Sequence, residues 1–254
     1  MFLSAAQTKY ATDGGMTGPF AHTFVLNTPA RMTLGNPQPH TWVYVNDDPN
    51  TRWAGYQCRV VESLSRIVLA TTGNAAFLDA RNLAFSLAMN WLTAFNTLWP
   101  NLDGVLNPNA GTSGEPARLY GAPTDYPHPG TSAPQTNAEE PHAPALVLRA
   151  CIWLKSSGIL STSQLATVNA IGKRVLDYLE LRWRDDESDT MRYTWANRGA
   201  ASREIYYGFW AFEIIATLAY MLENPDGAPE GADLDRAREF ITLHQLWLEE
   251  RTVS

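Results

Sequence analysis

The stretch that decides the fold is Ile-Tyr-Tyr-Gly-Phe-Trp-Ala-Phe-Glu-Ile-Ile-Ala-Thr-Leu-Ala-Tyr-Met-Leu, at residues 205–222. It is apolar on all sides rather than along one stripe, which is typical of a helix buried within a protein or within a membrane. Glu213 lies at its centre, where a carboxylate costs about 2.5–3.5 kcal/mol in a bilayer, and no flanking Lys/Arg cluster sets an orientation. The sequence therefore predicts a central helix packed on several sides by other helices, and no membrane span.

Helical periodicity extends outward from this segment over most of the chain. Ser161 with Gln164 forms a capping box, the signature of a helix N-terminus. Start and stop residues predict five further helices, at about residues 48–73, 74–100, 144–157, 161–183 and 234–250. The chain is therefore expected to be mainly helical.

An internal repeat groups these helices into pairs. Gly73 and Gly158 end the similar phrases Leu-Ala-Thr-Thr-Gly and Leu-Lys-Ser-Ser-Gly, and Gly227 ends a less similar one. Each repeat consists of a helix, a tight turn at the glycine and an antiparallel helix. Stacking three such pairs predicts a mainly α fold of stacked α-hairpins, with the first helix of the third hairpin the most enclosed.

Two segments depart from the helical pattern. Residues 1–48 are punctuated by Gly and Pro, with extended candidates at residues 22–26, 31–34 and 41–46. We interpret them as a short β-rich N-terminal arm that precedes an α-helical hairpin domain at residues 49–254. Residues 100–141 form a long loop insertion in that domain, and loops of this length are usually functional or disordered.

Composition narrows the class of protein. The 254 residues are 45% hydrophobic and 18% charged, which indicates a globular chain. The formal net charge of −7 argues against a nucleic-acid partner, because such proteins carry a basic patch that displaces counterions from phosphates. The N-terminus shows no signal peptide. Cys58 and Cys151 are expected to be buried free thiols.

Residues 69–84 carry the first resemblance to known proteins. Their sequence, Leu-Ala-Thr-Thr-Gly-Asn-Ala-Ala-Phe-Leu-Asp-Ala-Arg-Asn-Leu-Ala, resembles the hairpins of α/α-toroid proteins, typical of glycosidases and polysaccharide lyases. A full toroid has more hairpins than this chain can hold. The resemblance therefore implies a partial α/α-toroid-like fold.

The second resemblance extends over residues 50–225. It rests on the extended arm, Gly-Ala-Pro-Thr-Asp-Tyr-Pro at residues 121–127, Glu-Glu-Pro-His-Ala at residues 139–143, and a Trp-rich C-terminal hairpin. This combination resembles helical virion proteins of tailed bacteriophages, especially tail-tip components. It implies a protein assembled in the host cytoplasm with other virion subunits, as a homo- or hetero-oligomer.

The long loop holds candidate catalytic carboxylates. A glycosidase needs two carboxylates roughly 5–10 Å apart, and Asp125 with Glu139 or Glu140 is the candidate pair. The interpretation that we favour is structural: the two glutamates interact with the dipole of the following helix, and Asp125 is a turn residue. The candidates for stacking on a sugar are aromatic side chains from several segments: Trp99, Trp153, Tyr193, Trp195 and Trp210.

Glu213 is a further catalytic candidate. An interior carboxylate either pairs with an arginine or has a raised pKa, as a general acid does. Pairing with Arg149, Arg182 or Arg203 is the favoured outcome. The spacing of His128 and His142 matches no known metal-ligand pattern, so the sequence predicts no metal site and no cofactor.

Two functional hypotheses follow. The preferred one is a non-enzymatic structural or interaction component of a phage-like virion, in the tail or tail tip, that contacts neighbouring subunits or the host surface. The alternative is a carbohydrate-active protein of the α/α type, either a glycoside hydrolase, a polysaccharide lyase or a glycan-binding module, with its cleft under the long loop.

Overall fold

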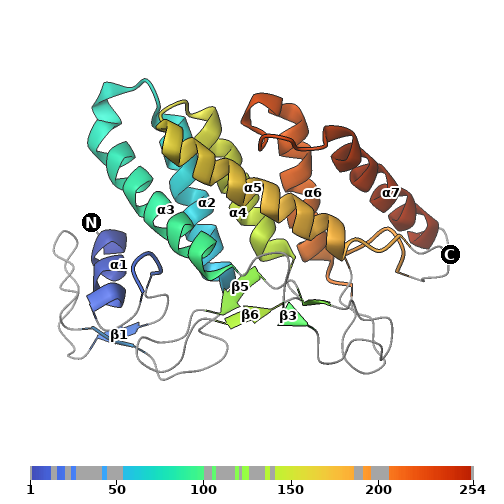
Figure 1. Ribbon diagram of the computed structural model, residues 1–254, viewed down its shortest axis with the longest axis horizontal. Coiled ribbons are helices and arrows are strands. Elements are labelled where there is room, and N and C mark those ends of the chain that lie inside the picture. The colour runs from blue at the N-terminus through green and yellow to red at the C-terminus, as the bar shows by residue number, and fades with distance from the viewer. Residues whose placement is uncertain are drawn as a thin grey trace. The chain divides into compact units, whose positions relative to one another are not determined.

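Figure 1 shows the computed structural model of the chain. The structure describes residues 2–12, 16–20, 24–26, 42–44, 54–99, 105–106, 118–119, 122–125, 135–137, 141–185, 191–195 and 206–252. Tertiary contacts divide the chain into two compact units. The first comprises Met1–Trp99 with Pro123–Asn137, and the second comprises Pro100–Ala122 with Ala138–Ser254.

The first unit is built on a helical hairpin. Helices α2 and α3 pack against each other, and α1 packs on α3. Strands β1 and β2 form an antiparallel pair, and β5 pairs with β6. The elements, in chain order, are α1 (Phe2–Thr12), β1 (Phe24–Leu26), β2 (Trp42–Tyr44), α2 (Ala54–Thr71), the 3-10 helix η3 (Ala75–Phe77), α3 (Leu78–Leu98), β5 (Ala122–Asp125) and β6 (Gln135–Asn137).

A buried glutamine fixes the segment before β1 onto this hairpin. The Gln57 side chain accepts from the Phe20 backbone N–H at 3.0 Å and from the Trp91 indole N–H at 3.1 Å, and it donates to the Phe20 carbonyl. Trp91 is fully buried and stacks on Phe95, with ring centroids 5.0 Å apart. Because buried polar groups must find partners, this network holds α2, α3 and residues 16–20 in one arrangement.

The second unit contains two helical hairpins. Helix α4 packs against α5, α6 and η4, and α6 packs against α7. Ser161 and Gln164 form the capping box of α5, as the sequence predicts. The elements are β3 (Val105–Leu106), β4 (Arg118–Leu119), α4 (His142–Ser156), α5 (Thr162–Arg182), α6 (Gly208–Glu223), the 3-10 helix η4 (Pro225–Gly227) and α7 (Leu234–Thr252).

The prediction of a mainly α fold built of α-hairpins is confirmed, and within the second unit two hairpins pack against each other through α4 and α6. The hairpins are α2–α3, α4–α5 and α6–α7, and Figure 1 shows the two helices of each pair side by side. Gly73 and Gly158 have φ angles of 80° and 69°, the left-handed conformation that ends a helix at low cost when the residue is glycine. Gly227 differs, because it lies in η4 against α4 and its φ is not positive.

The most enclosed helix is α4, and the prediction of α6 in this role is wrong. Twelve of the 15 residues of α4 are buried, against five of the 16 residues of α6. Helix α6 is highly apolar, but part of its apolar surface faces solvent: Phe209 and Phe212 are 54% and 63% exposed. None of the described helices combines the length and the apolar content needed to cross a bilayer.

The description of residues 1–48 as β-rich is not supported. Their longest described element is α1, a helix that the sequence analysis did not predict. Strands β1 and β2 fall within the extended candidates at residues 22–26 and 41–46, whereas residues 31–34 lie outside the described residues. The domain division after residue 48 stays a prediction.

Candidate functional site

The carboxylates predicted from the sequence are not brought together in the described part of the chain. Asp125 ends β5, and its side chain lies outside the described residues, as do Glu139, Glu140 and His128. Glu213 accepts a hydrogen bond from Arg149 Nη2 at 3.1 Å, and the same nitrogen reaches the Glu213 backbone carbonyl at 2.9 Å. Glu213 therefore ties α6 to α4.

The aromatic residues predicted to stack on a sugar are mostly packed within their own units. Trp99, Trp153 and Trp195 are at most 8% exposed. Trp210 is half-buried and stacks on His142, with centroids 4.5 Å apart and an angle of 10° between the rings. Tyr193 is half-buried as well. Sugar binding by these residues stays a prediction, and so does the carbohydrate-active alternative that depends on it.

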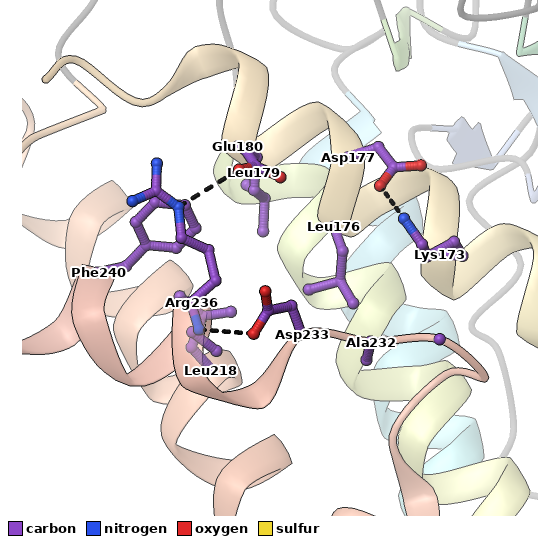
Figure 2. Close-up of a pocket in the computed structure, with 12 residues that line it drawn as sticks. Lys173, Leu176, Asp177, Leu179, Glu180, Leu218, Ala232, Asp233, Arg236 and Phe240 are labelled. Atoms are coloured by element: carbon purple, nitrogen blue, oxygen red, sulfur yellow. Dashed lines mark hydrogen bonds and ion pairs between the residues drawn. The ribbon is translucent and has the colours of Figure 1, made fainter.

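Two neighbouring features of the second unit form a better candidate site. The first is a pocket of about 60 Å³ between α5 and the segment that enters α7, shown in Figure 2 and called here the α5–α7 pocket. Its lining combines apolar and charged side chains: Lys173, Leu176, Asp177, Leu179, Glu180, Leu218, Gly231, Ala232, Asp233, Arg236, Ala237 and Phe240.

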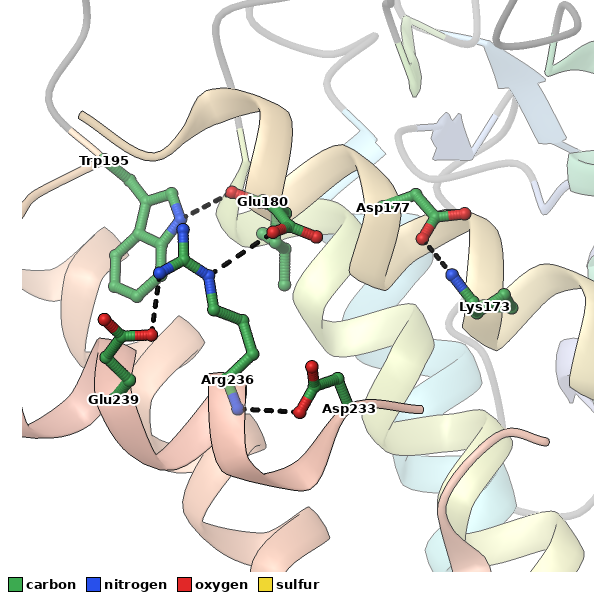
Figure 3. A network of polar contacts seen from close by, with 8 residues as sticks. Lys173, Asp177, Glu180, Trp195, Asp233, Arg236 and Glu239 are labelled. Atoms are coloured by element: carbon green, nitrogen blue, oxygen red, sulfur yellow. Dashed lines mark hydrogen bonds and ion pairs between the residues drawn. The ribbon is translucent and has the colours of Figure 1, made fainter. Parts of the chain in front are cut away.

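Four of the five charged side chains that line this pocket form ion pairs, Lys173 with Asp177 and Arg236 with Glu180 (Figure 3). Arg236 Nε donates to Glu180 at 3.3 Å, its Nη1 donates to Glu239 at 2.8 Å, and its guanidinium lies 4.4 Å from the centre of the Phe240 ring. Burial, the largest single influence, lowers the pKa of Arg236, but the two glutamates together outweigh it and raise the pKa. Arg236 therefore stays charged at any physiological pH and closes one side of the pocket.

The second feature is an aromatic cluster that shares Phe240 with the pocket. Its rings come from the end of α5, the segment before α6, and α7, and neighbouring centroids are 4.5–6.4 Å apart. Edge-to-face and offset arrangements at such distances add stability beyond the burial of area. The members of the cluster are Trp183, Tyr193, Trp195, Tyr206, Phe240, His244 and Trp247.

His244 is the chemically distinctive member of the aromatic cluster. Its Nδ1 lies 2.9 Å from the Tyr193 carbonyl, which can only accept, so Nδ1 carries the proton. In the neutral ring Nε2 then accepts from the Tyr206 hydroxyl, 3.0 Å away. Tyr193 itself has a φ of 64°, an uncommon conformation for a residue other than glycine. The strained backbone at Tyr193 places its carbonyl where it fixes the tautomer of His244.

The environment of the pair keeps both groups neutral. Burial lowers the pKa of His244, and the hydrogen bond to the Tyr193 carbonyl offsets this only in part. Burial also raises the pKa of Tyr206. Elsewhere in the unit, burial raises the pKa of Cys151 to about 12, so this thiol is no nucleophile at neutral pH.

The depressed pKa of His244 makes stability depend on pH. Between its folded pKa and the ordinary value of about 6.5, the unfolded chain binds the proton and the folded chain does not. We therefore expect the free energy of unfolding to fall as the pH drops below about 6.5. In urea unfolding between pH 7.5 and 5, the slope of the free energy of unfolding against pH gives the number of protons taken up on unfolding. This number should be smaller for His244→Gln than for the wild type, by up to about one. An unchanged slope in this variant would contradict the assignment.

The sequence analysis missed His244, Tyr206, Asp233 and Arg236. A usable signal was present, because Arg236, Phe240, His244 and Trp247 recur at three- and four-residue steps and so share one face of a helix. Within the residues that the structure describes, no group of three or more His, Cys, Asp or Glu side chains is placed to hold a metal ion.

No family model, curated protein or solved structure matches the chain. The resemblances to α/α toroids and to phage virion proteins therefore remain expectations from the sequence.

Proposed function

We propose that this chain is a structural and interaction subunit of a phage-like virion that binds a neighbouring protein subunit through one face of α6. The observation that carries the proposal is a row of exposed aromatic side chains. Tyr207, Phe209 and Phe212 are 36%, 54% and 63% exposed. Contiguous exposed apolar side chains of this size mark protein–protein contacts, whereas single ones are common on any surface.

The spacing of these residues supports a single contact surface. Phe209, Phe212 and the exposed Ala216 lie three and four residues apart, on one side of α6. The opposite side packs into the unit through Ile214, Leu218 and other buried residues. We call Tyr207, Phe209, Phe212 and Ala216 the aromatic face. Aromatic residues of this kind are the ones that contribute most to binding when an interface excludes water.

The virion context rests on the resemblance of residues 50–225 to tail-tip proteins. The aromatic face suits such a context, because a subunit held in an assembly covers apolar surface that a free monomer leaves in water. No chemistry at this face is needed, since packing against a second apolar surface supplies the driving force.

The test is assembly of the full chain with and without the aromatic face. The double variant Phe209→Ser/Phe212→Ser should abolish self-association measured by light scattering, or co-sedimentation with particles when the chain is produced during phage growth, with unchanged helical content. Leu246→Ser is the matched control, because Leu246 is a single exposed apolar side chain on α7. A wild-type chain that is monomeric at every concentration and absent from any particle would overturn the proposal.

A further inference from the structure

The α5–α7 pocket is a second feature, independent of the aromatic face. We propose that it binds a primary alkylammonium group, an ammonium at the end of a short apolar chain. The inner wall of the pocket is apolar and buried: Leu179, Leu218, Ala237 and Phe240 are each at most 4% exposed. A ligand that fills it must therefore offer apolar surface at its inner end or along its length.

The size of the pocket limits the ligand. A water-sized group needs roughly 10–15 Å³ of such space, so the 60 Å³ available holds about four to six groups of that size. A chain of about five carbon and nitrogen atoms fits, whereas a sugar ring or a nucleotide does not. The ligand is thus a small molecule or the tip of one side chain.

The charged side chains that line the pocket favour a cationic ligand over an anionic one. Two lining residues are cations and three are carboxylates, which leaves one negative charge in excess. Lys173 pairs with Asp177, and Arg236 pairs with Glu180. Asp233 makes no ion pair within the described part of the chain. An incoming anion would have to compete with existing pairs and face Asp233, whereas a cation finds a carboxylate that pairs with no cation among the described residues.

The Asp233 carboxylate is held in place to receive a donor. Its Oδ1 accepts the Arg236 backbone N–H at 2.9 Å, which caps the start of α7. Figure 2 shows the carboxylate of Asp233 between Leu176 and Arg236, facing the space of the pocket. The second oxygen, Oδ2, is the acceptor for the ammonium, while the carbon chain lies on Leu176 and Leu218.

An ammonium suits the pocket better than the other cations. A guanidinium is planar and favours an aromatic face, but the Phe240 ring already carries the guanidinium of Arg236. A divalent metal ion needs several oxygen ligands converging on one point, and the described residues offer no such group. An ammonium is compact, donates three hydrogen bonds and is carried on an alkyl chain.

The test is an NMR titration of the full chain with n-butylammonium chloride and with Nα-acetyl-lysine methylamide. We expect saturable shifts of the backbone amides of α5 and residues 231–240, at millimolar concentrations. Preference for the lysine derivative identifies a lysine side chain of a partner as the source, and preference for butylammonium identifies a free amine. No saturable shift with either probe, or equal shifts with n-butanol or sodium butyrate, would overturn the proposal.

Two charge-neutralising variants make the test specific. Asp233→Asn keeps a side-chain acceptor for the cap and removes the charge, so we expect binding of butylammonium to weaken about three- to fivefold. Asp235→Asn makes the same change two residues away, at an exposed position in the first turn of α7 that pairs with Arg238 and does not line the pocket. It should leave binding unchanged. Equal effects of the two variants would show that Asp233 does not hold the ammonium.

Discussion

Replacement of Trp91 by alanine is expected to lower the free energy of unfolding of the first unit by about 3–5 kcal/mol, the range for truncating a fully buried tryptophan. Trp91 is fully buried on α3, so the change leaves a cavity between α3 and its neighbours. It also removes the indole N–H that Gln57 Oε1 accepts. The loss should be measured by hydrogen exchange of the amides of α2 and α3.

Trp91→Phe separates the two contributions. Phenylalanine keeps a ring against Phe95 and leaves a smaller cavity, but it cannot donate to Gln57. Because Gln57 Oε1 still accepts from the Phe20 N–H at 3.0 Å, the loss should be only about 1–2 kcal/mol. Amides of α4 and α5 belong to the other unit and serve as the internal control. A loss of under about 1 kcal/mol for Trp91→Ala would contradict the role of Trp91 as the core of this hairpin.

The hairpin architecture was predictable because it depends on local signals. A capping box at Ser161, and glycines that take the left-handed conformation at residues 73 and 158, act within a few residues of chain. Helix α1 was missed because the segment at residues 1–48 was judged by its glycines and prolines, all of which come after Thr12.

The interior was harder to predict because burial depends on neighbours in space. The aromatic residues around Phe212 make α6 the most apolar stretch of the sequence, yet part of that apolar surface points outward. Helix α4 carries Arg149 and Lys155 and is more enclosed, since it packs on α5, α6 and η4 at once. An exposed apolar face and a buried one give the same sequence pattern.

The candidate site shows the same limit. Arg236 and His244 share a helix face with Phe240, and that face was visible in the sequence. Their partners Glu180, Tyr193 and Tyr206 are 38 or more residues away along the chain. No local pattern connects positions so far apart, so the α5–α7 pocket and the tautomer of His244 could not be predicted from the sequence.

Alanine and asparagine should rank in one order of stability at Gly73 and Gly158 and in the reverse order at Gly227. At Gly73 and Gly158 an added Cβ meets nothing within 4 Å, so the only cost is the left-handed backbone. We expect alanine to lower the free energy of unfolding by about 1–2 kcal/mol at these two positions. Asparagine should cost less than alanine there, because it tolerates this conformation better.

At Gly227 the order should be reversed, with alanine costing about 2–3 kcal/mol and asparagine more. The backbone there has no positive φ, but an added Cβ would lie 2.9 Å from Ile152 Cγ2 and 3.1 Å from the Ile152 carbonyl oxygen, and would overlap Ser156 Oγ. Urea unfolding followed by circular dichroism measures both series. Ser156→Ala should recover part of the Gly227→Ala loss, because it removes one of the overlapping atoms. If asparagine were better tolerated than alanine at Gly227, glycine would be required there for its backbone conformation, as at Gly73 and Gly158. The close contact between η4 and α4 would then not explain the glycine.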